Sequence, residues 1–202
     1  MEAALTEVEL QEAPAELRLP VDVEIRTLVP RGDERGYMVE LFRPDWEIPV
    51  RPIQWNLTMA HAGVLRGPQF HLHRHEYLIL LEGRMSVGLA DIRRGSPTEG
   101  LSVLVEAAAA PAGLPLVTIA AGGVFHGFYF HEDSKVLHAV PTIWDKRDEF
   151  RVRWNDPELG IPWPTLAPVQ SELERAAPSL QELADFFPIW QGPRPPRTPS
   201  PR

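Results

Sequence analysis

Ten short segments in the middle of the chain have a β-compatible hydrophobic pattern, and turn-forming residues separate them. They are Val21–Val29, Tyr37–Leu41, Pro52–Met59, Gln69–His73, Tyr77–Val87, Leu101–Val105, Pro115–Ile119, Gly127–Phe130, Lys135–Val140 and Arg151–Trp154. Turn signals such as Glu82-Gly83 and Ala121-Gly122-Gly123 lie among them. Strands spaced by roughly 8–12 residues with such turns are typical of sandwiches and barrels, so the pattern predicts an all-β domain.

The two ends of the chain have a different pattern. Met1–Arg18 is rich in Ala, Glu and Leu and fits either a helix or a frayed arm. Ser171–Phe187 has apolar residues at helical spacing, with Pro178 as a break point. Gly192–Arg202 is a Pro/Arg tail that buries almost nothing, so it is expected to be disordered. We therefore expect an arm (1–19), a barrel (20–170), a helical segment (171–190) and a disordered tail (191–202).

Composition narrows the classes of function. The 202 residues suit one domain, and a net charge of -8 argues against a nucleic-acid binder. Without cysteine the chain has no disulfide, thiolate metal site or cysteine nucleophile. No apolar run approaches the roughly 18–20 residues of a membrane span. The acidic start shows no secretion signal, so we expect a cytoplasmic protein without membrane contacts.

Histidines crowd one segment, Gly63–Gly83. In an extended strand Gln69, His71 and His73 share one face, and a tight turn after His71 would bring Glu76 onto the neighbouring strand. A second glycine turn leads to His126.

These spacings resemble the two cupin motifs. The run Gly63-x5-Gln69-x-His71-x4-Glu76-x6-Gly83 follows the first motif, with Gln69 in place of a histidine, and Gly123-Val124-Phe125-His126 follows the second. The resemblance implies a jelly-roll (double-stranded β-helix) barrel. Imidazole and carboxylate are good ligands for Fe, Mn, Ni or Zn. One hypothesis is therefore a divalent metal held by His71, Glu76 and His126, with Gln69; the alternative is a solvated histidine-rich hairpin.

A second resemblance covers residues 20–180. The matching segments are Gly32-Asp33-Glu34-Arg35-Gly36 with Glu40, Gln54-Trp55-Asn56, Val64-Leu65-Arg66-Gly67, Asp91–Thr98, Gly123–Phe128, Trp154–Pro157, Gly160–Pro164 and Ala176–Leu180. In this order and spacing they resemble the dTDP-4-dehydrorhamnose 3,5-epimerase family. The resemblance implies a cupin fold, a dTDP-sugar ligand, no required cofactor, and a homodimer that exchanges N-terminal strands through Pro20–Val29.

The resemblance also implies a set of binding residues. They are Arg35, Glu40, Gln54, Asn56, Arg66, His126 and an aromatic position at Trp144. Guanidinium forks at Arg35 and Arg66 suit a diphosphate, although both also fit a turn-surface charge. Trp144 fits either a ring that stacks on the ligand or a core residue.

The family's catalytic positions are changed in this chain. Gln69 stands where the family has its histidine base, and glutamine takes no proton at neutral pH. His138 aligns with the family's tyrosine acid and Glu174 with its aspartate. Glu76 aligns with a lysine, Val87 with an aspartate, and three residues are missing after His71. The candidate catalytic residues are therefore His71, His138, Gln69 and Glu174.

Three functions remain open. The first is an enzyme that enolises a nucleotide-linked keto sugar, as an epimerase or isomerase. The second is a metal-dependent cupin acting on another small substrate, such as a dioxygenase, isomerase or lyase. The third is a sugar-nucleotide binder without catalysis.

Overall fold

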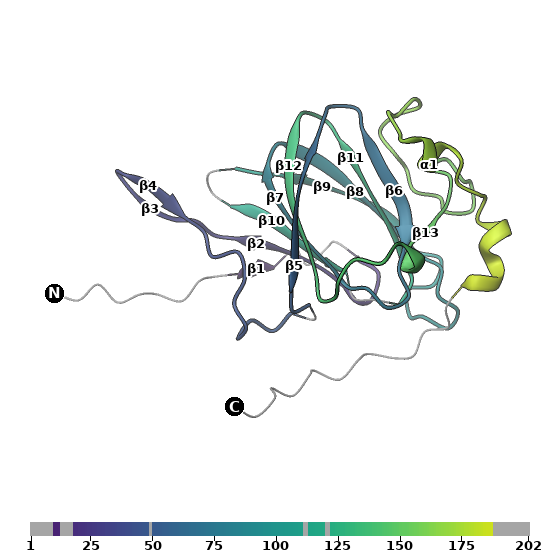
Figure 1. Cartoon of the computed structure of the whole chain (residues 1–202), viewed down its shortest axis with the longest axis horizontal. Helices are drawn as coiled ribbons and strands as arrows, with labels where there is room; N and C mark the ends of the chain where they lie inside the picture. The colour runs from purple at the N-terminus through teal and green to yellow at the C-terminus, as the bar shows by residue number, and fades with distance from the viewer. Residues whose placement is uncertain (1–9, 13–17, 49, 111–112, 120–121, 188–202) are drawn as a thin grey trace.

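A computed structural model describes residues 10–12, 18–48, 50–110, 113–119 and 122–187 (Figure 1). The strands are β1 (Leu10–Glu12), β2 (Val23–Leu28), β3 (Arg31–Asp33), β4 (Gly36–Met38), β5 (Gln54–Ala60), β6 (Leu65–Phe70), β7 (Glu76–Glu82), β8 (Arg84–Asp91), β9 (Ser102–Ala108), β10 (Leu114–Ile119), β11 (Val124–Phe130), β12 (Ser134–Val140) and β13 (Phe150–Arg151). One α-helical turn, α1 (Glu172–Arg175), and 3-10 turns at Lys146–Asp148 and Gln181–Phe186 complete the described elements.

Two antiparallel sheets face each other and form the barrel. The six-stranded sheet has the order β1-β2-β10-β7-β12-β5, and the five-stranded sheet has the order β13-β6-β11-β8-β9. Strands β3 and β4 form a separate hairpin that projects from the barrel (Figure 1). The predicted all-β jelly-roll fold is confirmed. The predicted single segment Tyr77–Val87 turns at Gly83, so it contributes to β7 in one sheet and β8 in the other.

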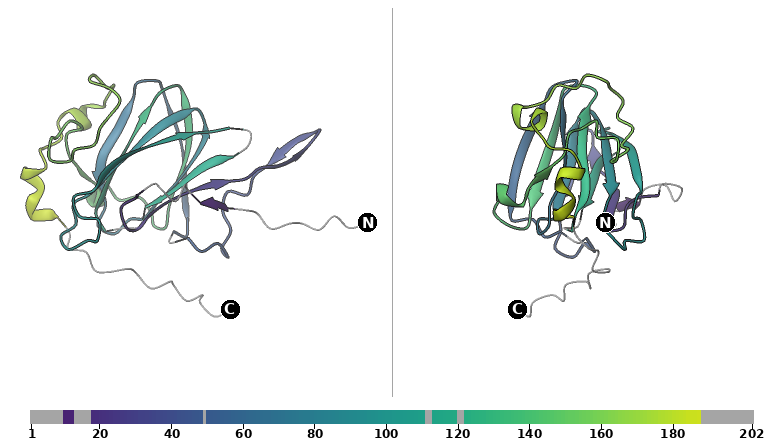
Figure 2. Two further views of the ribbon diagram at one scale, coloured as in Figure 1. Left: turned by 180° about the vertical axis from the view of Figure 1, so that it is seen from behind. Right: turned by 90° about the vertical axis from the view of Figure 1, so that its right-hand side faces the viewer.

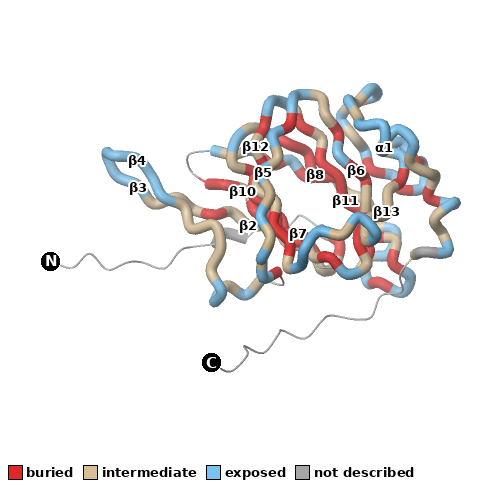
Figure 3. Tube along the Cα trace, in the orientation of Figure 1, coloured by how far each residue is buried: buried red, intermediate tan, exposed pale blue. Residues whose placement is uncertain are grey.

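Alternation along the strands sorts their side chains between the barrel interior and the outer faces. On β7, Leu78 and Leu80 belong to the interior core, together with Val87 and Leu89 of β8. Tyr77 and Ile79 point the other way, under the segment 39–48. Figure 3 shows the buried residues along the barrel strands and the exposed ones on the β3–β4 hairpin. Because side chains alternate in this way, polar residues two positions from these core residues also point into the barrel interior.

The C-terminal segment covers the outer face of the five-stranded sheet, at the end of the molecule away from the hairpin (Figure 2). Here Gly88 allows a close approach, because a Cβ at this position would lie 2.4 Å from the ring of Trp163. The predicted helix at Ser171–Phe187 is broken around Pro178, as expected, into α1 and a 3-10 turn. Among the described residues no helix is long and apolar enough to cross a membrane.

Only part of the predicted arm is described. Residues 10–12 form strand β1, paired with β2, and are not helical. The predicted disordered tail (191–202) lies outside the described residues.

A buried ion pair ties the segment before β2 to the barrel. The Arg93 guanidinium donates to both Asp91 oxygens at 2.9 and 2.8 Å, and also to Asp22 Oδ2 and the Val21 carbonyl at 2.7 Å each. Asp91 also accepts from the Ser96 hydroxyl at 2.6 Å. Burial works to raise the pKa of Asp91, but its hydrogen bonds outweigh burial and leave this pKa lowered.

The Asp91→Asn protein is expected to lose about 2 kcal/mol of unfolding free energy near pH 7, because charge-assisted hydrogen bonds are weakened. The pKa of Asp91 is lower in the folded protein than in the unfolded chain, where it is about 3.9. The ionised carboxylate therefore stabilises the fold at pH values above the unfolded pKa, and this stabilisation is lost as the pH falls through the folded-state pKa. Urea unfolding at several pH values should therefore show the two proteins converging in acid. A difference that stays constant down to pH 2 would contradict this assignment.

Candidate active site

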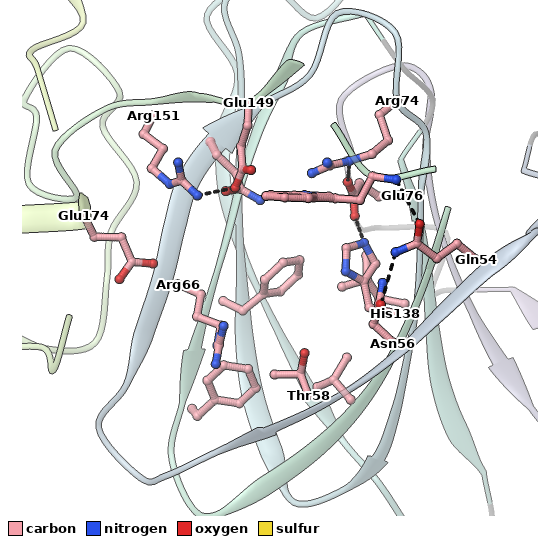
Figure 4. Close-up of a pocket in the computed structure, with 16 residues that line it drawn as sticks. Gln54, Asn56, Thr58, Arg66, Arg74, Glu76, His138, Glu149, Arg151 and Glu174 are labelled. Atoms are coloured by element: carbon pink, nitrogen blue, oxygen red, sulfur yellow. Dashed lines mark hydrogen bonds and ion pairs between the residues drawn. The ribbon is translucent and has the colours of Figure 1, made fainter. Parts of the chain in front are cut away.

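A cavity of about 390 Å³ opens between the two sheets at one end of the barrel (Figure 4). Strands β5, β7 and β12 form one wall, and β6 and β11 form the other. Its lining residues are Gln54, Asn56, Thr58, Arg66, Gln69, Arg74, Glu76, Leu78, Phe128, Phe130, Val136, His138, Trp144, Glu149, Arg151 and Glu174. Apolar rings on one wall thus face polar and charged side chains on the other.

His138 lies on β12 between the two neighbouring strands of its sheet. Its cross-strand partners are Asn56 on β5 and Leu78 on β7. Val136 and His138 share the inward face, because alternate residues of a strand point the same way. The register therefore places one imidazole among the polar residues of this wall.

The turn after β6 crosses from one sheet to the other. The expected position of Glu76 on a strand neighbouring β6 was wrong, because β6 pairs with β11 and β13 whereas β7 lies in the opposite sheet. The Asp148 carboxylate holds this turn by accepting the backbone N–H groups of Leu72 at 2.8 Å and Arg74 at 2.8 Å. Its backbone carbonyl also accepts from His71 Nδ1 at 2.5 Å.

Glu76 is the centre of a buried cluster. Its Oε1 accepts from Arg74 Nε at 2.8 Å and lies 3.1 Å from His71 Nε2, and its Oε2 is in ion-pair contact with His138 Nε2 (Figure 4). Arg74 also donates through one terminal nitrogen to His71 Nε2 at 2.8 Å. Burial works to raise the pKa of Glu76, but the neighbouring His138 and His71 hold it well below its usual range. Glu76 is therefore an anion between cationic and imidazole groups.

The contacts of His138 define its chemistry. A carboxylate only accepts hydrogen bonds, so the neutral form of His138 that suits its contact with Glu76 carries the proton on Nε2 and keeps a lone pair on Nδ1. Figure 4 shows the second ring nitrogen of His138 on the side of the open cavity. A side chain arranged in this way can accept a proton from a ligand, with Glu76 stabilising the resulting imidazolium.

His126 lies behind the cavity wall. It is 1% exposed, and burial lowers its pKa to about 3, so it stays neutral. Its Nδ1 donates to the Val124 carbonyl at 3.1 Å, and its Nε2 has no hydrogen-bond partner among the described residues. A ring in this position contacts His71, with centroids 5.2 Å apart, rather than a ligand in the cavity.

The predicted metal residues do come together. One ligand atom from each of His71, Glu76 and His126 lies within 4.8 Å of the others. However, the Arg74 guanidinium contacts two of these three residues, at His71 Nε2 and Glu76 Oε1, at 2.8 Å each. The positive guanidinium thus takes up the lone pair of His71 Nε2 and lies against Glu76, so the residues present do not fit a metal ion in this arrangement.

The remaining cavity residues offer hydrogen bonds to a polar ligand. Gln54 Oε1 accepts the backbone N–H of Trp144 at 2.9 Å, and Gln54 Nε2 donates to Asn56 Oδ1 at 3.2 Å. Trp144 is 47% exposed, so it lies at the rim and is not a core residue. Arg66 and Gln69 extend from β6 on the other wall.

Several predicted site residues lie elsewhere in this chain. Arg35 is on the β3–β4 hairpin, 84% exposed in its side chain and paired with Asp33, and Glu40 follows the hairpin near Arg43. Neither lines the cavity, because the hairpin projects from the barrel. His71 is buried behind the wall, which opposes the prediction that it acts directly as a base.

Glu174 lines the cavity, but both of its oxygens are engaged. Oε1 accepts the Gly67 N–H at 3.1 Å, and Oε2 accepts the Ser171 N–H and hydroxyl at 2.8 Å each. The contacts with Ser171 form a capping box that begins α1, and the bond from Gly67 ties this helix to β6. The geometry therefore gives Glu174 a positioning role more readily than a proton-transfer role.

Sequence reasoning missed Arg74, Asp148 and the Glu149–Arg151 ion pair. Arg74 lies in the predicted turn between two histidines, where a charged residue is usually solvated. Its burial depends on Asp148, which is distant in sequence. The one sequence signal for Arg74 is that a basic residue stands inside a motif whose other residues commonly bind metals.

The family profile described as dTDP-4-dehydrorhamnose 3,5-epimerase matches residues 19–182 of this chain. The dTDP-4-dehydrorhamnose 3,5-epimerase of Sinorhizobium fredii is 31% identical over 176 residues, which cover 81% of this chain and 89% of that protein.

Solved structures show the same architecture. The dTDP-6-deoxy-D-glucose-3,5-epimerase of Legionella pneumophila, in complex with dTDP-4-keto-L-rhamnose, gives a TM-score of 0.77 at 26% identity, covering 92% of this chain and all of that one (100%). A 4-keto-6-deoxy sugar epimerase from the novobiocin cluster of Streptomyces spheroides also gives 0.77 at 26% identity, covering 92% and 94% of the two chains.

Proposed function

Because this chain belongs to the dTDP-4-dehydrorhamnose 3,5-epimerase family, we propose that it enolises a dTDP-linked 4-keto-deoxysugar. In this reaction a base removes a proton from the carbon beside the keto group, and the proton later returns. Epimerisation and keto-isomerisation both begin with this step.

The cavity supports a sugar-nucleotide ligand. Arg66 supplies a guanidinium fork that suits a diphosphate, and the exposed Trp144 ring supplies a stacking surface for a base or sugar. Gln54 and Asn56 provide amide groups for sugar hydroxyls. The family resemblance implies that these positions lie around the nucleotide and the sugar.

One observation carries the catalytic proposal: His138 is paired with buried Glu76 on the cavity wall. Gln69, at the position of the family base, takes no proton at neutral pH. His138 Nδ1 is then the proton acceptor, and Gln69 acts as a hydrogen-bonding residue for the sugar. A binder without catalysis would have no need of a histidine oriented by a buried carboxylate, which favours an enzyme over the third alternative.

The proposal is tested by solvent exchange. The protein is incubated with dTDP-4-keto-6-deoxyglucose in deuterated buffer, and proton NMR follows the hydrogens at the carbons beside the keto group. Deuterium incorporation faster than in the same buffer without protein supports enolisation. Stabilisation by dTDP in thermal unfolding without any incorporation would favour the non-catalytic binder.

The metal-dependent alternative rests on the clustering of His71, Glu76 and His126. Arg74 opposes it, because the same atoms already contact a guanidinium. Elemental analysis of the purified protein distinguishes the two, since a stoichiometric Fe, Mn, Ni or Zn would favour the metal enzyme.

We also propose a homodimer. Trp55, Leu57 and Met59 expose an apolar face of β5, which ends the six-stranded sheet, and Tyr37 and Met38 are exposed on the hairpin. Large exposed apolar patches usually mark an interaction surface. A hairpin that packs on the other copy would carry Arg35 toward the partner's cavity, which gives the predicted diphosphate role of Arg35 a structural basis.

The Leu57→Asp protein is expected to be mainly monomeric at micromolar concentration, because the substitution places a charge in the apolar face. Light scattering after gel filtration measures its mass against the wild type. Leu166→Asp is the matched control, since Leu166 is 95% exposed in the C-terminal segment. A wild-type monomer, or equal loss of the dimer in both variants, would contradict the proposed interface.

A further inference from the structure

The Arg74 guanidinium is buried at the cavity, with one end still lacking a partner. Its side chain is 3% exposed, its Nε donates to Glu76, and one terminal nitrogen donates to His71. The other terminal nitrogen, Nη1, is buried and has no hydrogen-bond partner among the described residues. Arg74 nevertheless lines the cavity.

This orphaned donor needs an explanation. Buried polar groups in folded proteins are nearly always paired, and a charged N–H donor is especially unfavourable when unpaired. The backbone of Arg74 is fixed by Asp148, and the guanidinium is fixed by two 2.8 Å hydrogen bonds. The acceptor for Nη1 is therefore expected to come from a molecule in the cavity, and the chemistry of the donor favours an oxygen that is negatively charged or becomes so.

The geometry points to Arg74 as the catalytic electrophile of the proposed enolisation: Nη1 donates to the keto oxygen of the sugar. As His138 Nδ1 takes the proton from the adjacent carbon, the C–H electron pair forms the C=C bond. The carbonyl π electrons move onto oxygen, where Arg74 stabilises the oxyanion. Return of the proton to carbon restores the keto group. This inference rests on the proposed function and assigns its second chemical role.

Glu76 links the two groups that this step needs. One carboxylate oxygen holds Arg74 and the other holds His138 (Figure 4). In the sugar, the keto oxygen and the hydrogen on the adjacent carbon are only a few bonds apart. The base (His138) and the electrophile (Arg74) must therefore also lie close together. A preorganised donor in a buried site is an effective means of stabilising an oxyanion. Glu76 is thus a positioning residue for both.

The same arrangement explains why the cupin-type cluster does not favour a metal. A divalent ion would polarise the carbonyl as a Lewis acid. In this chain the guanidinium already contacts two of the three candidate ligand residues, His71 and Glu76, and can serve as the cation.

The test compares Arg74→Ala and Arg74→Lys with the wild type by deuterium incorporation into dTDP-4-keto-6-deoxyglucose. Loss of one oxyanion donor predicts roughly 100- to 1,000-fold slower exchange in Arg74→Ala. The affinity for dTDP, measured by calorimetry, should change by less than fivefold. Added methylguanidine should restore exchange in Arg74→Ala. Arg84→Lys is the control, because Arg84 is half exposed in its side chain and pairs with Glu106 on the outside.

The outcomes separate the two proposals. A wild-type protein that exchanges no hydrogen overturns the proposed function and this inference with it. A wild type that exchanges, with a folded Arg74→Ala protein that exchanges within threefold of it, overturns the inference alone. Stoichiometric metal whose removal abolishes exchange also overturns it.

One further measurement needs no Arg74 variant and decides the inference even where these variants fail to fold. Infrared spectroscopy follows the carbonyl of labelled substrate on the wild-type protein. A stretch at lower frequency than in solution supports a strong donor, and an unshifted stretch overturns the inference.

Discussion

The His138→Gln protein is expected to bind dTDP like the wild type and to exchange the substrate hydrogens about 1,000-fold more slowly, within the range for removing a general base. Glutamine preserves hydrogen-bonding capacity and approximate size but accepts no proton at neutral pH. The effect should fall on kcat rather than on KM, because His138 acts on the reacting carbon. Deuterium incorporation followed by NMR gives the rate, and calorimetry with dTDP gives the affinity.

His61→Gln is the matched control for this experiment. The His61 side chain is 90% exposed and lies against Asp133, and neither residue lines the cavity. Its exchange rate should equal that of the wild type. If His138→Gln exchanged within tenfold of the wild type, the base would lie elsewhere, and Glu174 would be the next residue to replace.

The strands and the barrel could be predicted because they depend on local patterns. The apolar runs Tyr77–Val87 and Lys135–Val140 predicted strands, and because side chains alternate along a strand, Glu76 and His138 share the interior face with Leu78 and Val136. The break of the C-terminal helix at Pro178 also follows from local chemistry. Such features need no knowledge of distant contacts.

The candidate site was predictable only in part. Motif spacing brought His71, Glu76 and His126 together correctly, yet it suggested a metal because it gave no role to Arg74. The backbone of Arg74 is held by the carboxylate of Asp148, which follows it by 74 residues. A hydrogen bond between such distant residues arises from the tertiary fold and leaves no periodic signal in the sequence.

The position of Arg35 illustrates a second limit. Its motif resembles that of a ligand-binding residue, but whether a hairpin returns to its own barrel or packs on another copy depends on loop geometry. In this chain β3 and β4 project outward, with Arg35 exposed (Figure 1). A sequence motif can therefore predict a binding residue without specifying which cavity its side chain would reach.

Glu76→Gln is expected to affect both stability and catalysis, because this carboxylate serves two partners. Removing its charge leaves the buried Arg74 guanidinium without a counter-ion, and breaking a buried pair in this way typically costs about 3–5 kcal/mol. The folded-state pKa of Glu76 is depressed, so its contribution is present above the unfolded value of about 4.3 and is lost as pH falls through the folded value. Urea unfolding should show the largest difference from wild type near neutral pH and convergence in acid.

The catalytic effect of Glu76→Gln should exceed what the loss of stability explains. If the amide oxygen still faces Arg74, the amide N–H₂ group meets His138 Nε2, which must then become the acceptor. The His138 proton moves to Nδ1, so the tautomer at the cavity is the wrong one for a base, and exchange should fall by about 1,000-fold or more even where the protein is fully folded. Glu82→Gln is the control, because Glu82 is exposed and pairs with Lys135 on the surface. If folded Glu76→Gln exchanged at the wild-type rate, Glu76 would stabilise the barrel without orienting His138, and the proposed base would lose its main support.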